Sequence, residues 1–245
     1  MLPEIFDTVL VIGMLVAFFA SGMTAYAGFG GALVMVPLFT LLIGPVQSIA
    51  LTGICSFVAL IHVVPGLLRR VRWREVLPVI IGLLISISFG SGFLVRADPQ
   101  IVRLFMGGFV LLAAAILIMD LRYSGPRGPL PSFGIGMVTG TIMGGAGVPA
   151  GPVMVIYYLA APEPPQVQRA NIMLSVWLLL LIMLASLTVR EAIEVDTVMI
   201  AVAVAPASIL GAFAGKYLFR RAPVTWFRSF AHGVLVVIGI SMLLI

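Results

Sequence analysis

Two glycine-rich segments carry the groups in this chain that are best placed to do chemistry. The sequence AGFGGALVMV at residues 27–36 recurs as AGVPAGPVMV at residues 146–155, at a spacing of 119 without a gap. A helix that begins after such a break leaves its first N–H groups without helical partners and presents the positive end of its dipole, and both features favour an anion. The predicted anion-binding residues are Gly28, Phe29, Gly30 and Gly31 in the first copy and Gly147, Val148, Pro149, Ala150 and Gly151 in the second.

Small polar side chains follow each segment at the same spacing of 119. Thr52 and Ser56 fall on Asn171 and Ser175. The members of each pair are one helical turn apart, so they project from one face of a helix and can complete the hydrogen bonds of a bound anion. Second-tier candidates, most of them expected to serve packing or the membrane interface, are Thr24, Tyr26, Gln47, Met143, Tyr157, Tyr158 and Trp177.

Helix packing is the alternative explanation for both sets of residues. Glycines in membrane helices mediate close helix contacts, and Ser, Thr and Asn hydrogen-bond from one helix to another. Either glycine segment alone favours packing. The occurrence of two segments at equivalent positions favours a binding site, because matching interruptions of apolar segments in two halves of a chain are typical of transport sites.

The composition identifies an integral membrane protein. Hydrophobic residues make up 62% of the chain, charged residues make up 9%, and the mean hydropathy is +1.22, whereas soluble proteins average roughly 45–50% apolar and about 25% charged residues. The formal charge of +5 comes from loops between apolar segments, where membrane topology accounts for it. No nucleic acid partner is therefore expected.

Catalytic, metal-binding and cofactor motifs are not expected. Cys55 is the only cysteine, which excludes an intrachain disulfide and a cysteine metal cluster. No Ser-His-Asp or paired-carboxylate arrangement is visible, and His62 and His232 have no carboxylate partner nearby in sequence. We therefore expect no catalytic residue, no metal, no cofactor and no enzymatic activity.

Apolar segments long enough to cross a bilayer are predicted at 47–68, 76–95, 101–119, 167–187, 197–218 and 225–245. The regions around the glycine breaks differ, because 132–145 and 150–161 are too short to cross about 30 Å at 1.5 Å per residue, although 5–27 is longer. We therefore predict two helical hairpins, at 5–44 and 132–161, whose arms meet at the glycine turns and return to the side from which they came.

The predicted fold is an all-α polytopic membrane protein built from two repeats. Each repeat is a Gly-broken helical hairpin followed by three transmembrane helices. The first repeat covers residues 1–123, a Pro- and Gly-rich linker covers 124–131, and the second repeat covers 132–245.

The basic residues support this topology. If each hairpin returns to its own side, eleven of the 14 Lys and Arg residues fall on one face and three on the other, whereas single broken crossings would divide them seven to seven. Basic residues in short loops mark the cytoplasmic side, so the hairpin topology is preferred. The predicted cytoplasmic residues are Arg69, Arg70, Arg72, Arg74, Arg122, Arg127, Arg169, Lys216, Arg220, Arg221 and Arg228, and the three opposite are Arg96, Arg103 and Arg190.

An odd number of crossings in each repeat inverts the second repeat relative to the first. This predicts a multi-pass protein of a bacterial inner membrane with both termini in the periplasm. The inversion also predicts that the half-helices starting near Gly31 and Ala150 enter from opposite faces and direct their N-termini towards one midplane site. No Asp, Glu, Lys or Arg lies in the middle third of a clear span, which disfavours a buried carboxylate pump.

These features resemble a known family. The GFGG run at Gly28, the LVMVPL run at Leu33, the basic loop with Trp73 and the weaker second copy are similar to the sulfite exporter family TauE/SafE, over nearly the whole chain. The resemblance implies a twofold-repeated helical bundle that exports small oxyanions such as sulfite, sulfonates or sulfoacetate. The second copy departs from the usual glycine-rich run, because it reads GVPAGP from Gly147, and this narrows access to the backbone.

The favoured function is a transporter that moves a small anion by alternating exposure of the midplane site, and its outward direction comes from the resemblance alone. The alternative is an anion channel, or a non-transporting membrane module whose glycines serve helix packing. The expected partners are a small anionic substrate of the sulfite, sulfonate or sulfoacetate class and the lipid bilayer. A homodimer, the coupling ion and the part of His62 or His232 in proton coupling are left open.

Overall fold

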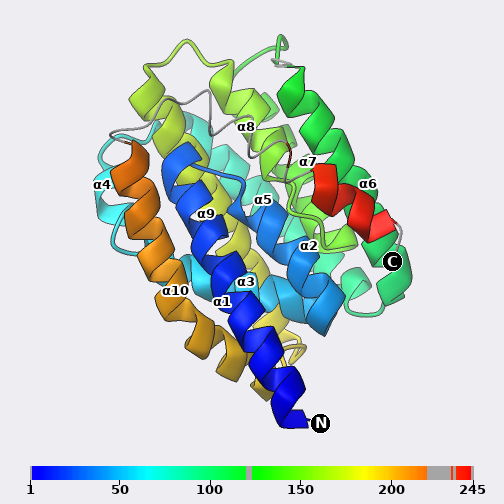
Figure 1. The fold of residues 1–245 in the computed structure, drawn as a ribbon. Coiled ribbons are helices and arrows are strands. Elements are labelled where there is room, and N and C mark those ends of the chain that lie inside the picture. Colours follow the sequence, from blue (N-terminus) through cyan, green and yellow to red (C-terminus); the bar gives the residue numbers. More distant parts are fainter. Residues whose placement is uncertain (1, 120–122, 220–232, 234–235, 244–245) are drawn as a thin grey trace.

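The computed structural model describes residues 2–119, 123–219, 233 and 236–243, and helices are the only regular elements in them. Residues 236–243 are helical, and the preceding helices are α1 Leu2–Ala27, α2 Gly31–Ile43, α3 Pro45–Leu60, α4 Val64–Leu68, α5 Trp73–Leu94, α6 Pro99–Ile118, α7 Pro129–Ala146, α8 Gly151–Leu159, α9 Pro165–Val189 and α10 Val195–Phe219 (Figure 1). The predicted all-α class is confirmed.

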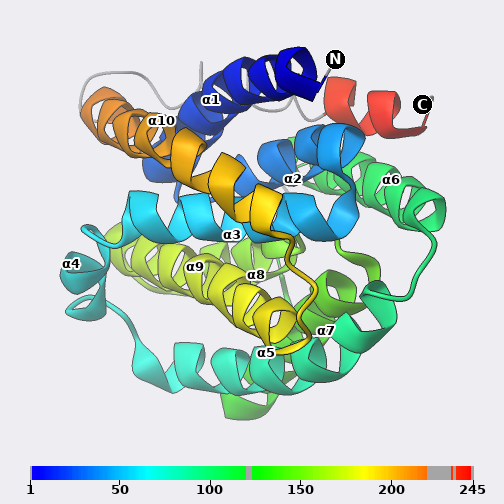
Figure 2. The same ribbon diagram turned by 90° about the horizontal axis from the view of Figure 1, so that it is seen from below.

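The helices are arranged in layers. In Figure 2, α1 and α10 form one outer layer, α5 and α7 form the other, and α2, α3, α8 and α9 lie between them. The inner helices carry many buried side chains, as expected for elements shielded on both sides. The glycine breaks before α2 and α8 therefore lie inside the bundle, away from lipid.

The outer pair α5 and α7 packs backbone against backbone. A Cβ atom on Gly136 would collide with the carbonyl oxygen of Val79, and one on Gly144 would lie 3.0 Å from the Cα atom of Ile87. These contacts advance in the same direction along both helices, so α5 and α7 run parallel. Small residues allow this approach, as in many membrane helix pairs.

The other outer pair, α1 and α10, is built in the same way. A Cβ atom on Gly211 would collide with the carbonyl oxygen of Phe18, and one on Gly215 would collide with that of Gly22. These contacts also advance in the same direction along both helices, so α1 and α10 run parallel. In each pair the glycines let one main chain rest on the other.

The two outer pairs occupy matching places in the sequence repeat. Their helices α1 and α7 end at Ala27 and Ala146, which are 119 residues apart. Each pairs with a helix from the other half of the chain, α1 with α10 and α7 with α5. The halves therefore interlock through both outer layers.

Four of the predicted membrane spans are confirmed as long apolar helices, α5, α6, α9 and α10. The predicted span at 47–68 is wrong as a continuous helix, because α3 ends at Leu60 and α4 begins only at Val64. Pro65 explains the interruption, since it has no N–H to donate to the carbonyl of Ile61 and its ring would clash there. The predicted span at 225–245 lies mostly outside the described residues.

Both predicted hairpins are present as a long helix, a break and a shorter helix. In the first, α1 is followed by α2; in the second, α7 is followed by α8. Helix α7 begins at Pro129 rather than at 132, because proline is favoured in the first turn of a helix, so the linker predicted at 124–131 is shorter than expected.

The two hairpins are connected to different ends of α9. The first leads into α3 beside the C-terminus of α9, where Gln47 Nε2 donates to the carbonyl of Ala192 at 3.1 Å. The second ends near the N-terminus of α9, where Gln168 Nε2 donates to the carbonyl of Ala161 at 2.7 Å. In the second hairpin, Arg127 Nη1 donates to the carbonyl of Tyr157 at 3.0 Å, so the two ends of that hairpin lie close together. The return of each hairpin to its own side of the membrane stays a prediction.

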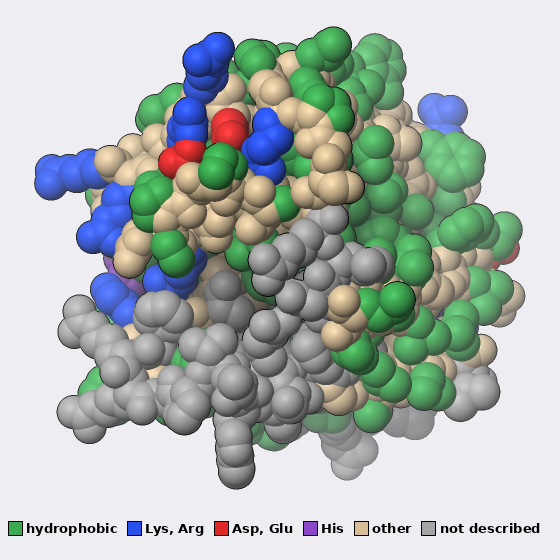
Figure 3. Space-filling model, turned by 90° about the horizontal axis from the view of Figure 1, so that it is seen from above, with side chains coloured by type: hydrophobic (Ala, Val, Ile, Leu, Met, Phe, Trp, Pro, Cys, Tyr) green, Lys and Arg blue, Asp and Glu red, His purple; other side chains and the backbone are tan. Residues whose placement is uncertain are grey.

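Basic side chains gather at the end of the bundle where α9 begins (Figure 3). Arg72 forms an ion pair with Glu163 there, and the Arg127 guanidinium lies 4.5 Å from the centre of the Tyr157 ring. Arg190 lies at the opposite end of α9. The predicted basic residues Arg122, Arg220, Arg221 and Arg228 lie outside the described residues.

Glycine packing in the outer layers can be tested on α7. We expect Gly136→Ala to cost about 1–3 kcal/mol, the usual range for overpacking, because its methyl group has no room beside Val79. The matched control is Gly134→Ala, two residues away, where nothing lies within 4 Å of an added Cβ. Thermal unfolding of the purified proteins measures both, and equal midpoints would contradict the backbone contact.

Cysteine labelling tests the orientation that the basic residues predict. With Cys55 replaced by Ser, we expect an impermeant maleimide to label a Gln100→Cys variant in intact cells but not an Arg74→Cys variant. Both positions are exposed and lie near opposite ends of α5. Both should react after permeabilisation, and the reverse pattern in intact cells would overturn the predicted orientation.

Candidate functional site

The first break is a tight turn that is capped from within its own hairpin. Gly28 and Gly30 have φ angles of 92° and 102°, in the left-handed region that glycine adopts without strain. The N–H of Gly31 donates to Thr24 Oγ1 at 3.1 Å, and the Thr24 hydroxyl donates to the carbonyl of Ala20 at 3.2 Å. Thr24 therefore satisfies one of the N–H groups that start α2.

Gly31 itself is required for packing. A Cβ atom there would collide with both Thr24 Oγ1 and the carbonyl oxygen of Ala20. The packing explanation therefore holds for this one motif glycine, because the first turn of α2 rests directly on α1.

The second break uses proline as well as glycine. Gly147 has a φ angle of 66°, and its N–H caps α7 by donating to the carbonyl of Met143 at 3.0 Å. Val148 and Ala150 are buried, and α8 begins at Gly151. Pro149 and Pro152 have no N–H group, so this break presents fewer unpaired donors than the first.

The two breaks meet at one small cavity. Phe29, Gly30, Ala32 and Leu33 line it from the first hairpin, Pro149, Gly151 and Pro152 line it from the second, and Val176, Leu179 and Leu180 close it from α9. These α9 residues lie near the middle of a helix that runs from Pro165 to Val189. The cavity volume is about 10 Å³, which is room for about one water molecule.

Gly151 differs from the other motif glycines. Its backbone is helical, and an added Cβ would meet only Val176 Cγ2, at an ordinary contact distance of 3.5 Å. Neither backbone conformation nor helix packing requires glycine here. The space left by its missing side chain faces a residue that lines the cavity.

Thr52 and Asn171, the leading members of the polar pairs, share an unusual feature. Both are fully buried, and each has a polar atom without a hydrogen-bond partner in the described structure, Thr52 Oγ1 and Asn171 Nδ2. Leaving such a group unpaired in the interior costs about 1–3 kcal/mol. The two positions are equivalent in the repeat, so the same cost is incurred twice.

None of the four predicted polar residues lines the small cavity. Asn171 Oδ1 accepts from the N–H of Arg72 at 3.0 Å. Ser175 is buried and bonded to the Tyr158 hydroxyl at 3.0 Å, and Ser56 is half-buried. The structure thus brings together the backbone parts of the predicted site and leaves its polar side chains apart from them.

Two other second-tier candidates have structural contacts. Gln47 joins α3 to the first turn of α10, because its Oε1 accepts from Thr197 Oγ1 at 2.9 Å. Trp177 stacks on Phe57, with 5.9 Å between ring centres. Gln47 therefore positions helix ends, whereas Trp177 packs α9 against α3.

Of the two histidines, His62 lies in the turn after α3 and His232 lies outside the described residues. The His62 ring stacks on Phe213 at 4.7 Å between ring centres. Burial, and secondly the charge of Lys216, lower the pKa of His62 below its usual 6.5. A lower pKa favours the neutral imidazole. No group of three His, Cys, Asp or Glu residues in the described part of the chain is placed to hold a metal ion.

Sequence reasoning missed a charged contact that joins the linker to the bundle. Glu75 is buried at the start of α5, and its Oε2 lies 3.6 Å from Nη2 of Arg127. It also missed the cavity wall on α9, because Val176, Leu179 and Leu180 are ordinary residues of an apolar helix and no pattern marks them. Only the folded arrangement identifies them.

Comparison with known proteins shows the family of this chain. The family model described as sulfite exporter TauE/SafE matches residues 13–242, nearly the whole chain. No curated protein and no solved structure matches. The two glycine breaks and the helices around them all lie within the matched residues, and the chain belongs to the TauE/SafE family of sulfite exporter-type membrane transporters.

Proposed function

We propose that this transporter exports a small oxyanion, such as sulfite or an organosulfonate, across a bacterial inner membrane. The anion binds near the membrane midplane between the N-termini of α2 and α8, and the two repeats expose it alternately to either side. The observation that carries this proposal is the single cavity at which both glycine breaks meet halfway along α9.

The backbone supplies the chemistry for an anion. The first turns of α2 and α8 carry N–H groups that have no helical acceptor, and both helix dipoles add positive charge at the same place. Thr24 Oγ1 accepts from the N–H of Gly31. The N–H groups of Gly30, Ala32 and Leu33 remain beside the cavity as donors for an anion. Helix N-termini bind sulfate-like anions in this way without a charged side chain.

The cavity is too small for the anion in the conformation described. It has room for about one water molecule, whereas sulfite has four heavy atoms. Binding therefore requires the two breaks to move apart. The outer pairs suit this motion, because α1 is fixed to α10 and α7 to α5 by backbone contacts, so each break can move with a rigid pair.

Thr52 and Asn171 extend the proposed site. Their unpaired polar atoms are expected to find a partner in a state with bound anion. Asn171 lies five residues before Val176, about 7.5 Å along the helix at 1.5 Å per residue, so a modest rearrangement brings its amide to a widened cavity.

Gly151 gives the sharpest test of the site. We expect Gly151→Ala to reduce sulfite uptake into inverted membrane vesicles roughly tenfold, equivalent to about 1.4 kcal/mol. The added methyl group enters the cavity without straining the backbone. The matched control is Gly145→Ala in α7, where nothing lies within 4 Å of the added atom and transport should be unchanged.

Counterflow in proteoliposomes separates the competing functions. A carrier shows saturable exchange of labelled for unlabelled sulfite, whereas a channel does not. Equal transport by Gly151→Ala and wild type would show that Gly151 is not part of the binding site. The absence of any sulfite flux in the wild type would support a module whose glycines only pack helices.

Thr52→Val tests the polar side chains separately from folding. Replacing an unpaired buried hydroxyl by a methyl group should leave the unfolding midpoint unchanged or raise it. If the hydroxyl binds the anion, sulfite affinity should fall roughly 10- to 150-fold, corresponding to about 1.5–3 kcal/mol for a hydrogen bond to a charged group. Calorimetry on the purified proteins measures the affinity.

Asn171→Leu should weaken sulfite binding by a similar factor, with smaller losses for Ser56→Ala and Ser175→Ala. Because Asn171 also accepts from the Arg72 N–H, its unfolding midpoint must be measured alongside. Unchanged affinity in both Thr52→Val and Asn171→Leu would leave only the backbone turns to hold the anion.

A further inference from the structure

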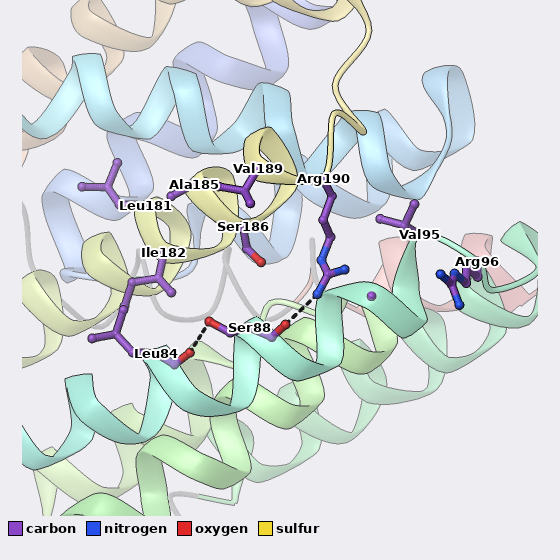
Figure 4. Close-up of a pocket in the computed structure, with 11 residues that line it drawn as sticks. Leu84, Ser88, Val95, Arg96, Leu181, Ile182, Ala185, Ser186, Val189 and Arg190 are labelled. Carbon is purple, nitrogen blue, oxygen red and sulfur yellow. Dashed lines mark hydrogen bonds between the residues drawn. The ribbon is translucent and has the colours of Figure 1, made fainter.

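A groove with a volume of about 790 Å³ lies between α5 and α9, separate from the small cavity. In Figure 4, Leu84, Leu181 and Ile182 lie at one end of it and Arg190 and Arg96 lie at the other. Its volume falls in the range of about 300–1,000 Å³ that is typical of small-molecule sites. One end is apolar and the other is cationic.

The Arg190 guanidinium is held in place by α5. Its Nε donates to Ser91 Oγ at 2.9 Å, and its Nη2 donates to the carbonyl of Ser88 at 2.7 Å. Ser91 is in turn bonded to Ser186 on α9 at 2.7 Å. A Cβ on Gly92 would lie 2.8 Å from Nη1, so the absence of a side chain there lets the guanidinium rest on the helix.

The two arginines at this end of the groove have no salt-bridge partner in the described residues. Neither Arg96 nor Arg190 forms an ion pair with a described carboxylate, and both side chains are exposed. Arg190 keeps donors on Nη1 beyond those used for Ser91 and Ser88. A fixed guanidinium with free donors next to a second one recognises a phosphate group well.

The length of the groove matches one leaflet of a bilayer. Arg190 directly follows α9, and Leu181 lies nine residues earlier, about 14 Å along the helix. Half of a hydrocarbon core is about 15 Å. Both α5 and α9 are long enough to cross the membrane, so the arginines stand near the interface while the apolar end lies near the midplane.

We infer that this groove binds one phospholipid with an anionic headgroup. The phosphate lies between Arg96 and Arg190, and one acyl chain follows Leu84, Leu181, Ile182 and Ala185 towards the midplane. A small free anion would use only the cationic end and leave the apolar walls exposed to lipid. An anionic lipid matches both ends at once.

Native mass spectrometry of the delipidated full chain tests this inference with added phosphatidylglycerol and with phosphatidylcholine of the same acyl chains. We expect one tightly held phosphatidylglycerol per chain and a clear preference over phosphatidylcholine. Arg96→Gln should weaken phosphatidylglycerol binding about fivefold, the effect of about 1 kcal/mol per arginine near a membrane surface. Its matched control is Arg74→Gln, exposed at the other end of α5, which should bind as wild type does.

A second variant tests the acyl-chain part of the groove. Ala185→Phe should fill the groove and weaken phosphatidylglycerol binding at least fivefold, whereas Val202→Phe, on an exposed position of α10 outside the groove, should not. Unfolding midpoints confirm that all variants are folded.

Three results would overturn the inference. The first is equal retention of phosphatidylglycerol and phosphatidylcholine by the wild type. The second is binding of glycerol phosphate as tight as that of the whole lipid, which would make the groove a site for a free anion. The third is dimerisation that excludes lipid, which would assign the groove to a second copy of the chain.

Discussion

A backbone N–H group that faces hydrocarbon has no water to donate to, so a helix can be broken inside a membrane only where protein surrounds the break. This constraint determines the layered arrangement of the chain. Both breaks lie between the outer pairs, and some of their donors are paired or absent. Thr24 accepts from Gly31, Met143 accepts from Gly147, and two positions of the second break are proline. The N–H groups of Gly30, Ala32, Leu33 and Gly151 belong to residues that line the cavity.

Local signals were sufficient to predict the breaks, whereas the partners of polar side chains were not predictable. Gly31 and Gly151 begin α2 and α8 almost where the repeat placed them, because glycine and proline act on the backbone of their own segment. The signal at Pro65 was equally local, and overlooking it produced one helix where there are two. By contrast, the bond between Asn171 and Arg72 joins residues 99 apart in sequence, and no periodicity encodes such a contact.

The glycines divide into classes that the sequence alone cannot separate. Glycine is required at positions 136 and 211 because the main chain of a neighbouring helix leaves no room for a side chain. Gly30 and Gly147 instead adopt a left-handed backbone. Gly151 meets neither condition. Packing and site formation are therefore not competing explanations for the whole set, since each applies to different members, and the distinction depends on which neighbour the fold supplies.

The interlocked outer layers have a consequence for biosynthesis. The contact between α1 and α10 joins Gly22 to Gly215, so 193 residues separate the two partners. At a synthesis rate of about 5–20 residues per second, α1 waits roughly 10–40 s in the membrane before α10 is made. During that interval its glycine face is open to lipid or to an insertion factor. A ribosome stalled after the first half would leave the hairpin of α1 and α2 in the bilayer without α10, on which α1 packs.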